Sequence, residues 1–240
     1  MIYFGTGNGL LYAVNLRDGD VRWTFEAGNH IKATPAYDGD RLYVGAWDGH
    51  FYSVDARSGD LIWKKRINTP HFSPTTSNPK LLNGRVYFVS HDYRTHCFDA
   101  ETGDVIWQYL AGDIEFQWNS PIVAECKPSY SSAVFHGETV HFCSLTGHVV
   151  GFHQDTGELV FQKQVSGPVF DSFPVLVRDI MYFGTTRGAL NALNLRTGEM
   201  TWEYSTGYHY IFSGPATDGQ LLAIGNMGGW LSVFPVSAEG

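Results

Sequence analysis

Short runs of apolar residues alternate with turns rich in glycine, aspartate and asparagine along the whole chain. In residues 42–63, three apolar runs are separated by turns that end at Gly49 and Gly59, and a fourth run follows Pro74. Runs of this length that are bounded by turn residues are typical of β-strands joined by hairpins. The pattern therefore predicts antiparallel sheets of four strands, repeated along the chain.

A glycine is followed four residues later by a large aromatic residue at five places: Gly19 and Trp23, Gly59 and Trp63, Gly103 and Trp107, Gly157 and Phe161, Gly198 and Trp202. The steps from glycine to glycine are 40, 44, 54 and 41 residues. Four residues before each glycine stands a turn-forming residue: Asn15, Asp55, Asp99, His153 or Asn194. A strand-rich repeat of about 40 residues is typical of a β-propeller.

We therefore predict an all-β chain in which residues 1–240 form a single β-propeller domain of four-stranded antiparallel blades, with six blades. Five complete blades with a composite closing blade, or part of a larger propeller, are the alternatives. The first repeat lacks the strand that should precede it, and the sixth, at 222–234, lacks its glycine and tryptophan strand.

The repeated aromatic residue has a structural explanation. A blade must bury both of its faces against its neighbours, and one large ring per blade can fill the wedge between two sheets. We therefore expect the aromatic residue of each repeat, such as Trp63, to be a packing residue. His153 stands where the other turns have Asp or Asn, so we expect it to take the same role in its turn.

Composition and charge exclude some classes of function. Hydrophobic residues make up 43% and charged residues 17%, which disfavours disorder. The net charge is -8 and no basic run occurs, so a nucleic-acid partner is not expected. No membrane span is predicted, and no signal peptide is visible, so the localisation stays open, with a periplasmic or secreted site if a leader was cleaved. Cys97, Cys126 and Cys143 fit no zinc spacing and are expected to be buried thiols.

The segment Leu11–Trp23, with the pattern Leu-Tyr-Ala-Val-Asn-x-x-x-Gly-Asp-Val-x-Trp, closely resembles the pyrroloquinoline-quinone-like (PQQ-like) β-propeller repeat. The resemblance covers nearly the whole chain and implies the propeller fold. Members of this family include quinoprotein dehydrogenases, an outer-membrane assembly lipoprotein that acts as a scaffold, and accessory domains attached to kinases and phosphoesterases. The dehydrogenases are longer and carry two adjacent cysteines beside the quinone. This sequence has no such pair, so we expect no cofactor.

The innermost strand of each propeller blade lines the central channel, and here it leads into a proline: Pro35, Pro74, Pro121, Pro174 and Pro215. Three residues before each proline stand Lys32, His71, Trp118, Asp171 and Phe212, and five before stand His30, Thr69, Phe116, Val169 and Tyr210. Alternate strand residues share a face, and matching positions of different blades converge at one channel mouth. The candidate ligand-binding funnel is therefore His30, Lys32, His71, Glu115, Gln117, Trp118, Asp171, His209, Tyr210 and Phe212.

Three interpretations of this funnel stay open. Its polar groups could simply solvate a water-filled channel. Its rings and polar groups could bind a sugar or a peptide. Alternatively, histidine and Asp171 could act as general base and acid or hold a metal, although no sequence spacing supports that. Whether the chain is an enzyme is therefore undecided at this point.

The function that we expect is a non-catalytic binding or scaffolding propeller, which uses its channel mouth or loops. Its partner would be a protein or a carbohydrate or other small-molecule ligand, with a catalytic domain in a parent chain as a further option. The alternative is a hydrolase or lyase with a His and Asp site in the funnel, with or without a metal.

Overall fold

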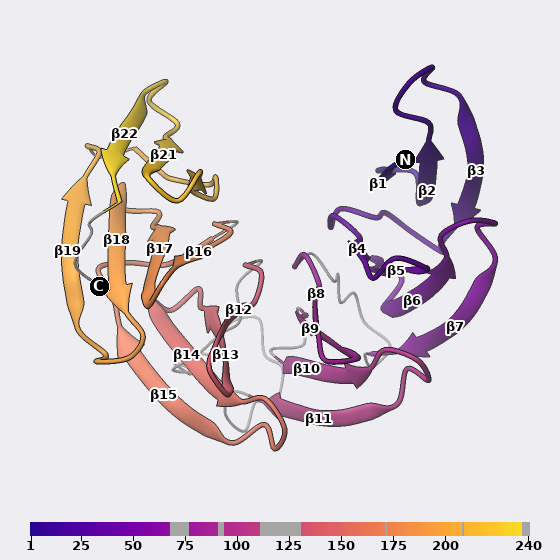
Figure 1. Cartoon of the computed structure of the whole chain (residues 1–240), viewed down its shortest axis with the longest axis horizontal. Helices are drawn as coiled ribbons and strands as arrows, with labels where there is room; N and C mark the ends of the chain where they lie inside the picture. Colours follow the sequence, from indigo (N-terminus) through magenta and orange to yellow (C-terminus); the bar gives the residue numbers. More distant parts are fainter. Residues whose placement is uncertain (68–76, 91–93, 111–130, 171, 208, 237–240) are drawn as a thin grey trace, which may run out of the picture. The chain divides into compact units, whose positions relative to one another are not determined.

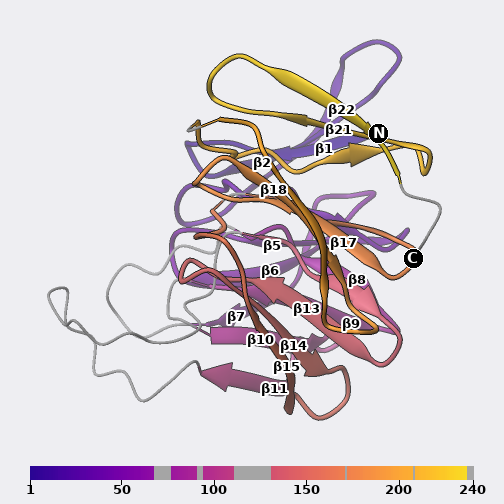
Figure 2. The same ribbon diagram turned by 90° about the vertical axis from the view of Figure 1, so that its left-hand side faces the viewer.

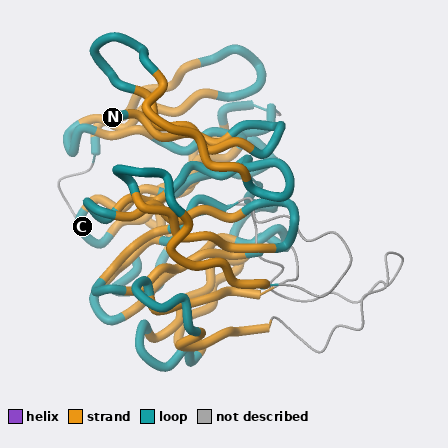
Figure 3. The backbone as a smooth tube through the Cα atoms, turned by 90° about the vertical axis from the view of Figure 1, so that its right-hand side faces the viewer, coloured by secondary structure: helices purple, strands orange, loops and turns teal. Residues whose placement is uncertain are grey.

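The computed structural model describes residues 1–67, 77–90, 94–110, 131–170, 172–207 and 209–236. All regular structure in these ranges is β-strand, which confirms the predicted class, and no helix there could cross a membrane (Figure 3). The chain divides into two compact units, Met1–Tyr109 and Leu110–Gly240. The expectation of a single domain over residues 1–240 stays a prediction.

Unit 1 contains three sheets, in each of which the strands follow chain order (Figure 1). Sheet 1 consists of β1 (Ile2–Gly5), β2 (Leu10–Val14) and β3 (Val21–Glu26). Sheet 2 consists of β4 (Ala36–Tyr37), β5 (Arg41–Gly45), β6 (His50–Asp55) and β7 (Leu61–Arg66). Sheet 3 consists of β8 (Lys80–Leu82), β9 (Arg85–Val89), β10 (Arg94–Asp99) and β11 (Val105–Leu110).

Unit 2 repeats this arrangement in three more sheets. Sheet 4 consists of β12 (Val134–His136), β13 (Thr139–Cys143), β14 (His148–His153) and β15 (Leu159–Gln164). Sheet 5 consists of β16 (Val175–Val177), β17 (Ile180–Gly184), β18 (Ala189–Asn194) and β19 (Met200–Ser205). Sheet 6 consists of β20 (Ala216–Thr217), β21 (Leu221–Gly225) and β22 (Leu231–Pro235).

The six sheets agree with the six predicted blades. Sheets 2 to 5 have four strands, whereas sheets 1 and 6 have three among the described residues. Sheet 1 corresponds to the last three strands of a complete sheet, and sheet 6 to the first three. The expected absence of the first strand in the first repeat, and of the glycine and tryptophan strand in the sixth, is therefore confirmed for the described part of the chain.

Within each unit, neighbouring sheets stack face to face. In unit 1, Leu11 of sheet 1 and Leu42 of sheet 2 belong to one core cluster, and the other face of sheet 2, with Tyr43 and Phe51, packs with Phe88 of sheet 3. Unit 2 is built in the same way, with sheet 5 between sheets 4 and 6 (Figure 2). Each inner sheet of a unit thus buries both faces, as the propeller prediction requires.

The repeated glycine and tryptophan meet across neighbouring sheets. The indole Nε1 of Trp63 on β7 donates a hydrogen bond to the carbonyl oxygen of Ala100 at 3.1 Å, in the turn after β10. A Cβ on Gly103 of the same turn would lie 2.7 Å from the Trp63 ring. Trp63 is only 8% exposed, which confirms its packing role. Trp23 and Gly59 repeat the contact between sheets 1 and 2.

A second aromatic residue supports each tryptophan from within its own sheet. Tyr43, Ser53 and Trp63 lie directly opposite one another on β5, β6 and β7, with the two rings 6.0 Å apart. We call these three positions the aromatic row. The small middle residue of the row allows the two outer rings to approach each other. Three other sheets have a complete row whose register is known: Tyr3, Ala13 and Trp23; His141, Gly151 and Phe161; and Tyr182, Ala192 and Trp202.

The row of sheet 4 departs from this pattern at both ends. His141 replaces the tyrosine and Phe161 the tryptophan, with the rings 5.3 Å apart. The Nε2 of His141 pairs with the Thr139 hydroxyl at 2.8 Å, while its buried Nδ1 has no hydrogen-bond partner. The pKa of His141 is lowered from 6.5 to about 4, first by burial and then by nearby His136.

His153 and the cysteines also follow the predictions. The Nδ1 of His153 accepts a hydrogen bond from the Asp155 amide at 3.2 Å, as the Asp55 carboxylate does from the Arg57 amide at 2.9 Å. His153 thus takes the turn role that aspartate has elsewhere. Cys97 and Cys143 are buried, and Cys126 lies outside the described residues.

We expect Trp63→Ala to lower the free energy of unfolding by about 3–5 kcal/mol, because it removes a buried indole from between two sheets. Chemical denaturation measures this loss. Ile62→Ala is the matched control, since Ile62 is the neighbouring residue on β7 and is 39% exposed. An equal loss in both variants would contradict the packing role.

We expect Gly103→Ala to destabilise the chain more than Gly19→Ala. Both glycines have a positive φ, +71° and +77°, so both substitutions carry the same backbone strain. Only at Gly103 would the new Cβ meet an indole ring, whereas nothing lies within 4 Å at Gly19. The difference between the melting temperatures of the two variants measures the cost of the contact between the new Cβ and the Trp63 ring. Equal melting temperatures would show that the ring can move aside without loss of stability.

We expect the free energy of unfolding to fall as the pH is lowered from about 6.5 to about 4, because the unfolded chain protonates His141 in this window and the folded chain does not. The lowered pKa corresponds to a loss of about 3 kcal/mol. Denaturation curves across this range measure the slope. His141→Tyr, which restores the row, should remove that part of it, and an unchanged slope would overturn the assignment.

Candidate functional site

The structure describes five of the ten predicted funnel residues. His30 and Lys32 belong to unit 1, and His209, Tyr210 and Phe212 belong to unit 2. The other five, His71, Glu115, Gln117, Trp118 and Asp171, lie outside the described residues. The convergence of all ten at one channel mouth therefore stays a prediction, and the site is described in each unit by itself.

In unit 1, His30 and Lys32 flank a buried anchor in the segment between β3 and β4. Ile31 is 2% exposed, and its amide donates to the carbonyl oxygen of Thr6 at 3.0 Å. The carbonyl oxygen of His30 accepts a hydrogen bond from the Trp47 amide at 2.9 Å, and the two rings meet edge to face at 5.4 Å. The anchor leaves both His30 and Lys32 exposed.

In unit 2 the same backbone arrangement displays aromatic residues. Ile211 is the buried anchor, and the carbonyl oxygen of Tyr210 accepts a hydrogen bond from the Met227 amide at 3.0 Å. Tyr210 is 54% exposed and Phe212 37%, with their rings 5.5 Å apart. The His209 ring lies against the turn at Gly228, where a Cβ would be 2.4 Å from it.

Phe170 lies beside Phe212, although counting back from the prolines in the sequence did not identify it. The amide of the buried Val169 bonds to the carbonyl of Ser144 at 3.1 Å, as the anchors Ile31 and Ile211 bond to theirs. Phe170 is therefore the equivalent of Lys32 and Phe212. The count back from Pro174 gives Asp171 instead, because this segment has one residue more between anchor and proline. Alignment on the anchor would have found Phe170.

The Phe170 ring lies 5.6 Å from that of Phe212, edge to face. We call Phe170, His209, Tyr210 and Phe212 the loop cluster. It offers exposed ring faces and one imidazole, a surface suited to stacking and apolar contact rather than to binding a charged group. Among the described residues, no three His, Cys, Asp or Glu side chains are placed to hold a metal. The hypotheses of a metal site and of an acid–base site both depend on His71 and Asp171, which lie outside the described residues.

A cleft of about 350 Å³ lies between the innermost strands of sheets 2 and 3 in unit 1. Its walls include Thr34, Tyr37, Asn78 and Lys80. The Asn78 carboxamide oxygen accepts a hydrogen bond from the Thr34 amide at 2.7 Å and so ties the two walls together. The sequence did not predict this cleft.

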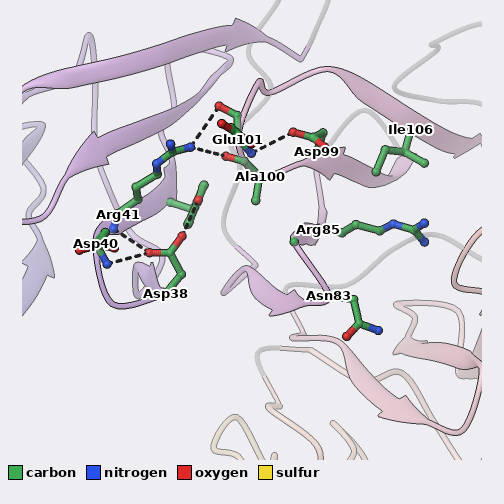
Figure 4. A pocket seen from close by; sticks show the side chains of 11 residues that line it. Asp38, Asp40, Arg41, Asn83, Arg85, Asp99, Ala100, Glu101 and Ile106 are labelled. Carbon is green, nitrogen blue, oxygen red and sulfur yellow. Dashed lines mark hydrogen bonds between the residues drawn. The ribbon is translucent and has the colours of Figure 1, made fainter.

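A larger cleft of about 720 Å³ lies at the opposite end of the strands of sheets 2 and 3, among their Asp and Asn turns (Figure 4). The Arg41 guanidinium crosses it and donates to the carbonyl oxygens of Ala100 at 3.5 Å and Glu101 at 3.2 Å. Asp40 on its rim pairs with Arg57 at 3.2 Å. Sequence reasoning missed this cleft too, because its walls come from ordinary turn residues.

The carboxylates in this larger cleft serve the turns themselves. Asp38 accepts hydrogen bonds from the Tyr43 hydroxyl at 2.7 Å and from the amides of Asp40 and Arg41. Partial burial alone would raise the pKa of Asp38, but these bonds lower it overall. Asp99 in the same way accepts from the amides of Glu101 and Thr102. Charge that is already paired in this way does not favour a particular ligand.

The comparisons with known proteins agree with the repeat. The model of the family described as outer membrane protein assembly factor BamB matches residues 7–169 and 134–235. Among solved structures, BamB from Moraxella catarrhalis is similar over 98% of this chain and 72% of that chain, with a TM-score of 0.76 and 24% identity. The sequence has no match among the curated proteins.

Quinohemoprotein alcohol dehydrogenases have the same fold. The enzyme ADHIIG from Pseudomonas putida HK5 is similar over 85% of this chain with a TM-score of 0.67 and 18% identity, and that from Comamonas testosteroni over 85% with 0.69 and 16%. The chain spans only 40% and 41% of the length of these two enzymes. At such identities the likeness shows the fold alone.

The family match and the structural neighbours together confirm the PQQ-like repeat and the β-propeller fold. The matched segments cover nearly the whole chain. This chain belongs to the family of the outer membrane protein assembly factor BamB.

Proposed function

We propose that this chain is a non-catalytic binding propeller that holds a protein partner through the loop cluster of unit 2. The observation that carries the proposal is the exposure of Tyr210 and Phe212 beside each other, on a segment fixed by the buried Ile211 and by the bond to Met227. A segment held by a buried side chain and a backbone hydrogen bond presents its rings at a lower cost in conformational entropy than an unanchored one.

The chemistry of the cluster supports a protein partner. Aromatic residues are enriched near the centres of protein interfaces. A tyrosine there can pack its ring against the partner and form a hydrogen bond through its hydroxyl. Met227, which is 67% exposed and bonded to the Tyr210 backbone, adds an adaptable apolar side chain beside the rings. Such a surface fits an extended apolar segment of another polypeptide.

The family supports the same proposal. Its description names an assembly factor for outer membrane proteins, and a role in contact with other proteins agrees with that name. The unit 1 equivalents of the loop cluster, His30 and Lys32, are polar, so the repeat tolerates different chemistry at this position. We therefore propose that contact with the partner is concentrated on the aromatic side in unit 2.

We expect the double variant Tyr210→Ala, Phe212→Ala to bind a protein ligand at least about tenfold more weakly, because two exposed rings that lie in contact are lost together. The probe is a peptide selected from a random phage-displayed library on the wild-type chain, and isothermal titration calorimetry measures its affinity. Tyr204→Ala is the control, since Tyr204 is 45% exposed in the same unit and lies on β19, outside the cluster.

Equal affinities of the selected peptides for the wild type and the double variant would overturn the proposed site. A glycan-array signal that disappears in the double variant, together with no peptide selection, would replace the protein partner with a carbohydrate. Melting curves of both variants establish that the loss is not one of folding.

A further inference from the structure

Arg187 lies in the turn between β17 and β18, directly beside the loop cluster. On one side the turn is bonded to the segment before β16, from the Thr186 amide to the Pro168 carbonyl at 2.8 Å. On the other side the Ile211 amide donates to the Thr185 carbonyl at 3.2 Å. The turn that carries Arg187 is therefore held between the two segments that carry the loop cluster.

The Arg187 side chain is exposed but held in place. Its Nη1 donates to the carbonyl oxygen of Ser166 at 3.1 Å. Its aliphatic stem lies against Gly167, where a Cβ would be 2.9 Å from both Cγ and Cδ of Arg187. A guanidinium has five N–H donors in a planar fork, so one bond to a carbonyl leaves donors for a carboxylate.

The guanidinium of Arg187 has no counter-ion among the described residues. None of the ion pairs there includes Arg187, whereas Arg196 of the same unit pairs with Asp179 at 3.1 Å. Apart from Glu203 on β19, the described carboxylates of unit 2 belong to turns at the opposite end of the strands: Glu138, Asp155, Glu158, Asp179, Glu199 and Asp218. The end that carries the loop cluster thus has a positive charge and no described turn carboxylate to neutralise it.

We propose that the partner of the loop cluster is an acidic segment of another protein, in which apolar residues contact the rings and an Asp or Glu carboxylate binds Arg187. This inference rests on the proposed function and names the chemistry of the partner at the same site. The rings supply apolar contact. The charge-assisted bonds to Arg187 fix the orientation of the segment, because the guanidinium fork matches a carboxylate in geometry.

The spacing between Arg187 and the rings sets the length of the segment. Ser166, which holds the guanidinium, and Phe170 of the loop cluster are four residues apart, which spans at most about 14 Å. An extended partner covers that distance in about four residues. The carboxylate should therefore lie within about four residues of the apolar residue that meets the rings.

The test uses the whole chain and peptides selected on it from a random phage-displayed library. The peptides that are kept are those whose binding weakens in the double variant Tyr210→Ala, Phe212→Ala. We expect them to carry Asp or Glu within about four residues of their apolar residues. Isothermal titration calorimetry then compares each synthetic peptide with its amide form, in which Asn or Gln replaces the acidic residue.

The amide form should bind the wild type at least about fivefold more weakly than the acidic form, because the bonds to Arg187 lose their charge. Arg187→Gln should bind the two forms equally. Arg196→Gln is the matched control, since it removes an arginine at the opposite end of the same unit and should keep the wild-type difference. Melting curves of both variants check that the fold is kept.

Charge reversal tests the contact directly. Arg187→Glu should bind a peptide with Lys at the acidic position better than the acidic peptide, which reverses the preference of the wild type. Raising NaCl from about 0.05 M to about 0.5 M should reduce the wild-type preference, because salt screens an exposed pair. An unchanged preference for the acidic peptide in Arg187→Glu would overturn the proposal.

The outcomes separate this inference from the proposed function. Peptides that need the rings but bind the wild type and Arg187→Gln equally would reject the acidic partner and leave the proposed function intact. Failure to select any ring-dependent peptide would reject both. Asp171 follows Phe170 in the sequence and lies outside the described residues. Coupling between Arg187→Gln and Asp171→Asn in the melting temperature of the free chain would make Asp171 the counter-ion of Arg187 and overturn the proposal.

Discussion

The contact between an indole ring and a glycine of the next sheet is the interaction on which the rest of the described structure depends. Only glycine accepts the positive φ of the turn and also leaves room for a ring 2.7 Å from where a Cβ would be. The indole N–H is satisfied by the carbonyl of Ala100 in the same turn. The ring therefore fixes both the spacing and the alignment of two stacked sheets, so that their apolar faces can pack against each other.

The aromatic row extends this constraint through each sheet. A ring on the first strand and a ring on the third can support each other only if the residue between them is small. In sheet 4 the middle residue is Gly151, where a Cβ would lie 2.6 Å from the His141 ring and 2.9 Å from the Cβ of Phe161. In sheet 6 the first position shrinks to Ala223 and the middle one grows to Val233. The positions of a row that the structure describes thus change together, because they share one volume.

The repeat made most of the framework predictable. Strand positions, the incomplete first and last sheets, the packing role of Trp63 and the turn role of His153 all follow from local rules that recur in every copy. The site residues were harder to predict than the framework, because the prediction counted back from each proline and the segment before Pro174 has one residue more than its counterparts. The equivalence of Phe170 with Lys32 and Phe212 follows only from the structure, in which the buried anchor Val169 forms the same backbone hydrogen bond as the other anchors.

The same anchors explain how one framework can carry different chemistry. Ile31, Val169 and Ile211 are buried and bonded alike, whereas the residues beside them range from Lys32 to Phe212. Substitution next to an anchor changes the surface and leaves the stack of sheets intact. What differs between the two units of this chain is the set of side chains displayed beside the anchors, which is polar beside Ile31 and aromatic beside Ile211.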